Sequence, residues 1–327
     1  MADYRSSGVD LEGHAGLVGR IREIACGAGR PEVLAGVGLF AGAIALPAGL
    51  REPVLVASTD GVGTKVLLAA RCGRYAEVGQ DVVIHGANDV ATSGARPLFF
   101  LDYLAVHRLD PEAVVQVVEG VASACRRAGC ALIGGETAQM PDLYREGTYD
   151  LAGTLVGVVE RAALVQPRPA AGDVVVGIPS SGLHTNGFSL VRRILEQTGT
   201  DPGPAADMLL QPSRLYSGDV ATLQAQGATL HGMAHITGGG LPGNLSRALT
   251  PAWDAVLDPG AWHRPGVFRW LSDLGGIAEE EMRRVFNLGI GFCLLVPRSE
   301  AGAVCAAIGG ARMIGSVVPG EGRVRFS

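Results

Sequence analysis

Short apolar runs of strand length alternate along this chain with longer segments of helical periodicity. The run at 53–57 predicts a buried strand, and a glycine-rich turn leads from it into a helical segment at 66–71. The almost wholly apolar run at 97–106 predicts a strand that is buried on both faces or pairs across an interface. Asp110, followed by a proline, predicts the start of a helix that ends near 128. The alternation continues without a fixed short repeat, which indicates two α/β-type domains of mixed α+β organisation.

A proline-rich stretch at 166–172 predicts the boundary between these domains. We therefore expect an N-terminal domain at 1–167 and a C-terminal domain at 168–327, each of ordinary domain size. Near the start, Asp10 is the expected N-cap of a helix over 10–29.

The segment at 75–94 predicts a helix with polar side chains on one face. Asp81, His85 and Asp89 are spaced by about one turn each, with Asn88 beside the last of them. Asp89 lies among small and apolar residues, where a buried carboxylate is costly unless a metal ion or a cation meets it. A capping or ion-pair role is the alternative for Asp89. We interpret His85 as a buried or interface histidine with satisfied hydrogen bonds rather than as a ligand.

The residues that follow the 53–57 strand are suited to holding a metal-bound phosphate. A strand that ends in a glycine-rich turn and starts a helix presents backbone N–H groups to an anion. Hydroxyls, an acid and a lysine flank this turn, and the spacing of a P-loop is absent. The residues concerned are Thr59, Asp60, Gly61, Gly63, Thr64 and Lys65.

Composition gives a further indication, because Lys65 is the one lysine among 27 lysine and arginine residues. A lysine that persists where the chain otherwise uses arginine suggests a site that needs a compact ammonium group rather than a planar guanidinium. Chance survival of a surface lysine is the alternative.

A second strand, at 131–133, is expected to end in a glycine turn that carries an acid and a hydroxyl, namely Gly135, Glu136 and Thr137. The chain then has three carboxylates near the ends of elements: Asp60, Asp89 and Glu136. Oxygen ligands of this kind suit Mg²⁺ that is held jointly with polyphosphate oxygens.

Two loops in the C-terminal half resemble further anion sites. Residues 180–187 follow a strand and precede a helix, and they combine hydroxyls, glycines, a histidine and an amide. Residues 235–240 form a similar loop before a short helix. A capped turn is the structural alternative. The polar and glycine positions of interest are Ser181, His184, Asn186, His235, Thr237, Gly238 and Gly239. A third glycine-rich stretch, at 35–42, is compatible with either a packed β-turn or a flap over a nucleotide.

Charge and composition narrow the class of protein. A net charge of -5 gives no electrostatic footprint for nucleic acid. The chain has no run of 18 or more apolar residues, so we expect no membrane span. Its N-terminus lacks the pattern of a signal peptide. The six cysteines are scattered without metal-ligand spacing, which indicates reduced thiols in a cytoplasmic protein.

The order of these motifs resembles the phosphoribosylformylglycinamidine cyclo-ligase family, also called aminoimidazole ribonucleotide synthetases. The resemblance covers essentially the whole chain. The motifs that carry it are Asp-Gly-Val-Gly-Thr-Lys at 60–65, Asn-Asp at 88–89, Pro-Leu-Phe-Phe-Leu-Asp-Tyr at 97–103, Gly-Gly-Glu-Thr-Ala at 134–138, Ser-Ser-Gly-x-His-x-Asn-Gly at 180–187, His-Ile-Thr-Gly-Gly-Gly at 235–240 and Phe-Asn-x-Gly-Ile-Gly at 286–291.

The resemblance implies a two-domain cyclo-ligase-type fold and a homodimer in which N-terminal strands form a barrel across the interface. It implies that ATP phosphorylates the formyl oxygen of formylglycinamidine ribonucleotide, after which the ring closes to 5-aminoimidazole ribonucleotide. Such a transfer needs charge neutralisation and positioning more than covalent help.

The resemblance also suggests a role for each motif. Lys65, Asp89 and His235 are the expected catalytic residues, and Asp60, Asp89 and Glu136 the expected Mg²⁺ ligands. ATP is assigned to Thr59, Asp60, Gly61, Gly63, Thr64, Lys65, Asp89, Gly135, Glu136 and Thr137. The substrate is assigned to Ser181, His184, Asn186, Thr237, Gly238 and Gly239, and contact with its phosphate or its reacting end remains open for His184 and His235.

Relatives of the same architecture are the nearest alternatives. A selenophosphate synthetase would require a reactive cysteine near the N-terminus, and a hydrogenase-maturation dehydratase would require a C-terminal cysteine; neither is present. A thiamine-monophosphate kinase would require a shorter acidic motif. A catalytically inactive scaffold would have no need of buried, unpaired carboxylates.

Overall fold

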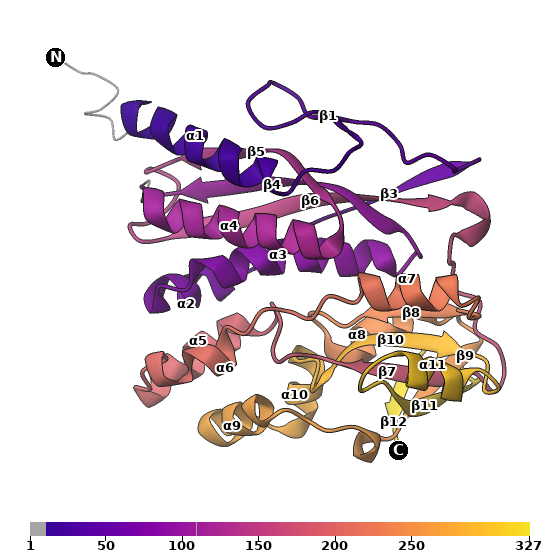
Figure 1. The fold of residues 1–327 in the computed structure, drawn as a ribbon. Coiled ribbons are helices and arrows are strands. Elements are labelled where there is room, and N and C mark those ends of the chain that lie inside the picture. Colours follow the sequence, from indigo (N-terminus) through magenta and orange to yellow (C-terminus); the bar gives the residue numbers. More distant parts are fainter. Residues whose placement is uncertain (1–10, 109) are drawn as a thin grey trace.

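The computed structural model describes residues 11–108 and 110–327, and Figure 1 shows two β-sheets with helices packed against them. The N-terminal sheet has the strand order β3-β6-β4-β5. Its strands are β3 (Pro53–Gly61), β6 (Tyr149–Glu160), β4 (Arg96–Val106) and β5 (Ala131–Gln139). All its pairs are antiparallel except β4 with β5, which is parallel. A separate pair of short strands, β1 (Val33–Ala35) and β2 (Ala43–Ile44), precedes it.

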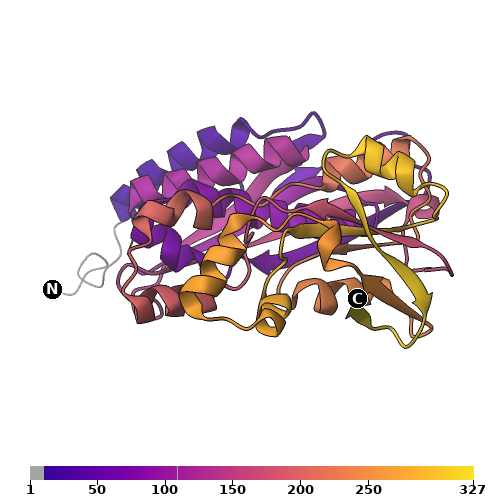
Figure 2. The same cartoon turned by 90° about the horizontal axis from the view of Figure 1, so that it is seen from below.

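Helices α3 (Tyr75–Ala91) and α4 (Pro111–Ala128) cover one face of this sheet. They approach closely because each has a glycine at the crossing. A Cβ on Gly79 would lie 2.1 Å from the carbonyl oxygen of Val117, and one on Gly120 would lie 2.1 Å from that of Ala76. Helix α1 (Leu11–Cys26) runs beside α4 (Figure 2), where Arg20 pairs with Glu112. Its expected N-cap, Asp10, lies outside the described residues.

The C-terminal sheet has six strands in the order β12-β9-β11-β7-β10-β8, all antiparallel except β12 with β9. Apolar clusters on its two faces form the C-terminal core. Its strands are β7 (Val174–Pro179), β8 (Gly232–His235), β9 (Trp253–Leu257), β10 (Ile290–Val296), β11 (Arg312–Pro319) and β12 (Val324–Phe326). Its helices are α5 (Phe188–Thr198), α6 (Ala206–Leu209), α7 (Ser217–Ala225), α8 (Gly240–Leu245), α9 (Gly266–Gly275), α10 (Glu279–Val285) and α11 (Ala301–Ala307). The expected mixed α+β organisation is confirmed.

Two elements differ instructively from the sequence-based expectations. Helix α2 (Lys65–Cys72) begins at the lysine itself. Strand β5 continues through residues 134–137, so the expected glycine turn there is wrong. Gly135 stays in the strand because it pairs with Asp102 of β4, and the carboxylate of Asp102 occupies the space that a side chain at 135 would fill.

Asp102 is half-buried, with no cation beside it in the part of the chain that the structure describes, and the loss of solvent around its carboxyl raises the pKa to about 7. An unfolded chain would ionise this group near its ordinary pKa of 3.8. The folded state therefore holds the proton over a range where the unfolded state has lost it, so the contribution of Asp102 to stability falls as the pH rises from about 4 to about 7. We expect Asp102→Asn to raise the free energy of unfolding relative to the parent chain by roughly 1–4 kcal/mol at pH 8 and by less at pH 5. Urea unfolding at both pH values checks this, and a difference that does not depend on pH would contradict it.

Candidate functional site

The polar face predicted for α3 lies at the junction between the two halves of the chain. His85 places its ring Nδ1 3.1 Å from the hydroxyl of Thr185. The amide of Asn88 donates to the carbonyl oxygen of Arg214 and accepts from the backbone N–H of Tyr216. One helix therefore positions side chains from the N-terminal half directly against the C-terminal loops.

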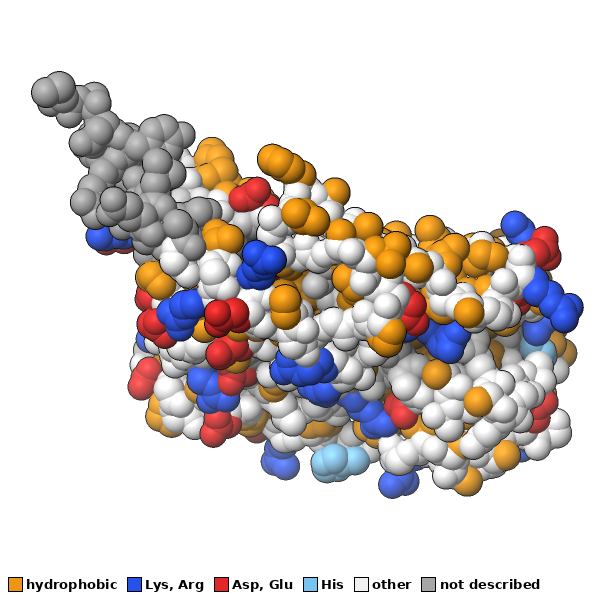
Figure 3. Space-filling view, turned by 45° about the horizontal axis from the view of Figure 1, so that its top comes forward, with side chains coloured by type: hydrophobic (Ala, Val, Ile, Leu, Met, Phe, Trp, Pro, Cys, Tyr) orange, Lys and Arg blue, Asp and Glu red, His pale blue; other side chains and the backbone are white. Residues whose placement is uncertain are grey.

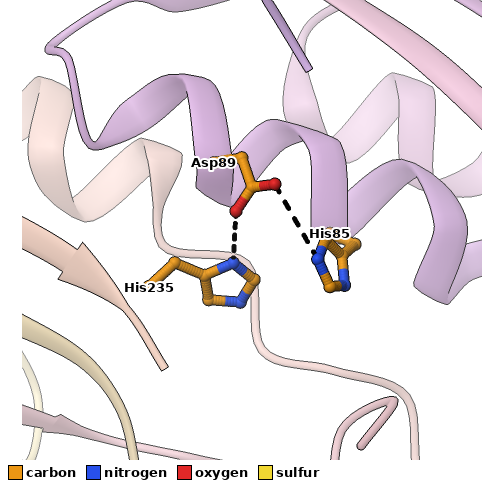
Figure 4. Close-up of side chains that lie close together, drawn as sticks. All are labelled: His85, Asp89 and His235. Atoms are coloured by element: carbon orange, nitrogen blue, oxygen red, sulfur yellow. Dashed lines mark hydrogen bonds and ion pairs between the residues drawn. The ribbon is translucent and has the colours of Figure 1, made fainter. Parts of the chain in front are cut away.

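Four side chains meet at one end of this face, as Figure 4 shows for three of them. Nδ1 of His235, at the end of β8, lies 2.8 Å from Oδ1 of Asp89. Nε2 of His85 lies 3.8 Å from Oδ2 of Asp89 and 3.0 Å from Oδ2 of Asp60, at the end of β3. Ser58 donates to Oδ2 of Asp89 at 2.8 Å. The side chains of Asp60, His85, Asp89 and His235 line a cavity of about 350 Å³ that Thr237, Asn244 and Arg247 also border.

Burial and charge set the protonation of this group. Burial acts to raise the pKa of Asp89, but the hydrogen bond and charge of His235 and the charge of His85 outweigh it and hold the pKa below its ordinary value. Burial acts to lower the pKa of His85, yet its hydrogen bond to Asp60 and the two nearby carboxylates raise it. Burial lowers the pKa of His235 despite Asp89. The site therefore combines carboxylates that ionise readily with one histidine whose pKa is raised, His85, and one whose pKa is lowered, His235.

Lys65 is not in this cavity. Its ammonium is fully buried and pairs with Oδ2 of Asp81 at 2.6 Å. It also donates to the carbonyl oxygens of His184 at 2.9 Å and Gln211 at 3.2 Å. All three neighbours of the ammonium are groups of the protein, which supports a structural role for Lys65, and the expected contact with an ATP phosphate stays a prediction.

The turn before Lys65 nevertheless has the features expected of an anion site. Gly63 has a φ of 56°, and the N–H groups of Gly63 and Thr64 have no hydrogen-bond partner among the described residues. The hydroxyl of Thr64 lies 3.2 Å from that of Ser189, at the start of α5, and a Cβ on Gly63 would lie 4.0 Å from the carbonyl oxygen of Thr185. The turn at 59–65 and the loop at 180–187 are therefore adjacent in space.

Glu136 and Thr59 lie on the other face of the N-terminal sheet. Asp60, Gly153, Asp102 and Gly135 are in register across the four strands, so the neighbouring position 136 faces away from Asp60. Three strand spacings, about 14 Å, also separate β5 from β3. Within one chain, Glu136 therefore cannot bind the same ion as Asp60 and Asp89. Gly135 and Thr137, also on β5, are separated from Asp60 by the same three strand spacings. The hydroxyl of Thr59 pairs with that of Thr154.

The loop at 180–187 uses part of its polar set for its own structure. The hydroxyl of Ser181 donates to the carbonyl oxygen of Pro212 at 2.7 Å. His184 is buried, burial lowers its pKa well below the ordinary value, and its Nε2 accepts N–H groups of Ser181 and Arg214. Two nitrogens of this loop, His184 Nδ1 and Asn186 Nδ2, are buried without a partner among the described residues.

The loop at 235–240 is held by Asn244, which donates to the carbonyl oxygens of Thr237, Gly238 and Gly240. This fixes Thr237, Gly238 and Gly239 beside the cavity, and a Cβ on Gly238 would lie 3.4 Å from Oδ1 of Asn186. The two predicted substrate loops therefore meet.

Sequence reasoning missed two members of the site. The sequence favours a buried or interface histidine at 85, and the contact with Thr185 fits that interpretation, but the ring also faces both carboxylates. Its place four residues before Asp89 was the available signal. Arg247 borders the cavity without a sequence pattern that marks it.

Comparison with known proteins defines the class. The chain matches the models for the N-terminal domain of AIR synthase related proteins over residues 41–159 and for their C-terminal domain over 170–326. It is 50% identical over 311 residues to the phosphoribosylformylglycinamidine cyclo-ligase of Synechococcus sp. CC9605, covering 92% of this chain and 90% of that protein. It is 48% identical to the enzyme of the same name from Thermosynechococcus vestitus, covering 98% of both. The chain belongs to the phosphoribosylformylglycinamidine cyclo-ligase family, and the recognition made from its motifs is confirmed.

Solved structures of more distant proteins share the fold. Thiamine-monophosphate kinase from Stenotrophomonas maltophilia K279a superposes with a TM-score of 0.69 at 21% identity, covering 95% of each chain. The hydrogenase maturation protein HypE of E. coli superposes with a TM-score of 0.68 at 20% identity, covering 96% of this chain and 94% of that one. At this identity the likeness concerns the fold alone. No described helix is both long and apolar enough to cross a membrane.

Proposed function

We propose that this chain uses ATP to close the imidazole ring of 5-aminoimidazole ribonucleotide from formylglycinamidine ribonucleotide, a step of purine biosynthesis. Family membership supports the reaction. The structural observation that carries the proposal is the meeting of Asp60, His85, Asp89 and His235 beside the two adjacent anion loops. Acids, imidazoles and free N–H groups converge there from both halves of the chain.

Asp60 and Asp89 are proposed to hold Mg²⁺, whose charge would offset that of the ATP phosphates. Their donor set fits a dication, since both carboxylates reach one cavity and their pKa values are held low. The N–H groups of Gly63 and Thr64, at the start of α2, would bind phosphate oxygens. Glu136 is left out of this assignment because it lies on the opposite face of the sheet, and Gly135 and Thr137 are left out because three strand spacings separate β5 from β3.

The substrate is proposed to lie between the loops at 180–187 and 235–240. Asn186 has a buried amide nitrogen without a partner, so it is suited to an acceptor oxygen on the substrate. His235 borders the cavity and is hydrogen-bonded to Asp89, so it can exchange a proton with a group bound there. Ser181 and His184 would shape the loop, since Ser181 Oγ and His184 Nε2 already have protein partners.

The chemistry requires the formyl oxygen to become a leaving group. Transfer of the γ-phosphoryl group of ATP to this oxygen gives a phosphorylated imidate and ADP. Attack of the amidine nitrogen on the activated carbon closes the ring, and the oxygen leaves as inorganic phosphate. The protein would position both reactants and stabilise the charge that moves between them.

Purified protein should release ADP from ATP only when formylglycinamidine ribonucleotide and Mg²⁺ are both present. A coupled ADP assay with each component omitted in turn tests this. Thiamine monophosphate is the control substrate, because a kinase of the same fold would phosphorylate it. Equal ADP release without formylglycinamidine ribonucleotide would refute the proposal.

We also propose that the protein is a homodimer formed through the uncovered face of the N-terminal sheet. Leu55 on β3 is 57% exposed and Tyr103 on β4 is 38% exposed, and hydrophobic side chains gather on this side in Figure 3. A contiguous exposed apolar face is typical of an interaction surface. Leu55→Glu should convert the dimer to a monomer in sedimentation velocity, whereas Met313→Glu, at an exposed methionine on β11, should not. A monomeric parent chain would contradict the proposal.

The division into domains at 1–167 and 168–327, and residence in the cytoplasm, are proposed on narrower grounds. Strand β6 ends at Glu160 and β7 begins at Val174, so no strand crosses the proposed boundary. All six cysteines are unpaired, which suits a reducing compartment. Limited proteolysis tests the domain boundary: cleavage within 161–173 is expected, and cleavage confined elsewhere would contradict it. Cell fractionation tests the localisation, and recovery outside the cytosolic fraction would contradict it.

A further inference from the structure

The geometry points to a transition-metal site formed by His85, Asp89 and His235 that binds a dication such as Mn²⁺, Co²⁺ or Zn²⁺ without nucleotide; we propose it as a property of this chain. It shares Asp89 with the function proposed above but does not depend on that reaction. One donor atom from each of the three residues lies within 4.8 Å of the other two.

The spacing of the donor atoms suits a single ion. Metal–ligand bonds of about 2.0–2.2 Å place neighbouring ligand atoms about 3.0–3.5 Å apart. The observed separations are 2.8 Å from Oδ1 of Asp89 to Nδ1 of His235 and 3.8 Å from Oδ2 of Asp89 to Nε2 of His85. Small adjustments of the three side chains therefore bring all three atoms to bonding distance of one centre.

The donor types favour a transition metal over Mg²⁺. Imidazole nitrogen suits Zn²⁺, Cu²⁺, Fe²⁺ and Ni²⁺, whereas Mg²⁺ prefers oxygen ligands. Two histidines and one carboxylate leave coordination positions free, as catalytic zinc and iron sites do. The cavity of about 350 Å³ beside them has room for water or a ligand oxygen at those positions.

The surroundings supply the outer contacts that metal ligands usually have. His85 has Thr185 at its other ring nitrogen, so Nε2 is the atom turned toward the carboxylates of Asp60, at 3.0 Å, and Asp89, at 3.8 Å. Ser58 donates to Oδ2 of Asp89 and orients the carboxylate. Such contacts fix the ring tautomer and strengthen ligand binding. In the free protein, a proton on Nδ1 of His235 makes the hydrogen bond to Asp89 and one on Nε2 of His85 makes the bond to Asp60, and a bound dication would displace both protons.

The probe is Co²⁺, added to nucleotide-free protein and followed by its visible absorption. We expect one equivalent to bind with the bands of nitrogen and oxygen ligation and with release of protons, measured calorimetrically in two buffers of different ionisation enthalpy. His85→Met and His235→Met should each weaken binding at least ~100-fold, and Thr185→Val about 10-fold. His231→Met is the matched control, since His231 forms an equal 2.8 Å pair with Asp173 outside the site.

The outcome separates this site from the proposed reaction. Absence of stoichiometric Co²⁺ binding to the folded parent chain would overturn the inference without any variant. Thiolate charge-transfer bands, which would place the ion on cysteines, would overturn it too, as would unchanged affinity in both folded histidine variants. Each result stands whether or not the ADP assay succeeds, because no nucleotide is present.

Discussion

Replacing Lys65 by methionine should lower the free energy of unfolding by about 3–5 kcal/mol, because it leaves the buried carboxylate of Asp81 without its cation. The ion pair is fully buried, and Asp81 also accepts from the N–H and hydroxyl of Ser213. The lysine further holds two carbonyl groups of the C-terminal half. Loss of the lysine should therefore loosen the contact between the turn at 59–65 and the loop at 180–187, which would lower turnover as well as stability. Urea unfolding measures the first effect and the coupled ADP assay the second.

Companion variants distinguish this role from a general loss of charge. Lys65→Met combined with Asp81→Asn should recover part of the stability, because the buried pair is then neutral. Lys65→Arg should lower turnover at least ~10-fold, about 1.4 kcal/mol of transition-state stabilisation, since a planar guanidinium does not fit the space of a compact ammonium. Arg71→Met, an exposed cation on the same helix, should change neither property. Equal kinetics for Lys65→Arg and the parent chain would show that any cation suffices.

Asp89→Asn should lower kcat/KM for Mg–ATP at least ~100-fold, about 2.7 kcal/mol, with a smaller effect on affinity for the ribonucleotide. The carboxylate is the group on which His235, Ser58 and His85 converge, and asparagine keeps its shape while removing its charge. A Mg²⁺ titration of the reaction should show a higher half-saturating concentration.

Asp207→Asn is the control for this substitution, because Asp207 is exposed and pairs with Arg74 away from the cavity. It should leave the Mg²⁺ titration unchanged. An unaltered titration in Asp89→Asn would remove Asp89 from the proposed metal site and return it to an ion-pair role with His235.

The part of the site that lies on one helix could be predicted from the sequence. Residues one helical turn apart share a face, so the polar face of α3 was predictable from the spacing of Asp81, His85 and Asp89. The partners on the C-terminal loops were not predictable, because nothing local records which segments fold together. His85 shows this limit: its contact with Thr185 spans 100 residues of sequence.

Strand register explains why Glu136 is left out of the proposed metal site. The sequence around Glu136 resembles a glycine turn, but pairing with β4 extends the strand and turns the glutamate to the opposite face. Composition marks the lone lysine as a special position, and in the structure its ammonium forms a fully buried ion pair with Asp81. Composition does not predict where a side chain points, however. The ammonium of Lys65 points into the junction between the two halves of the chain rather than toward the cavity.

The central claim is that the formyl oxygen of the substrate is phosphorylated by ATP before the ring closes. Formylglycinamidine ribonucleotide labelled with ¹⁸O at the formyl oxygen, converted by the purified protein with unlabelled ATP, tests it by mass spectrometry of the released phosphate. The account predicts one ¹⁸O atom in each inorganic phosphate formed. Unlabelled phosphate with the label recovered in water would contradict it.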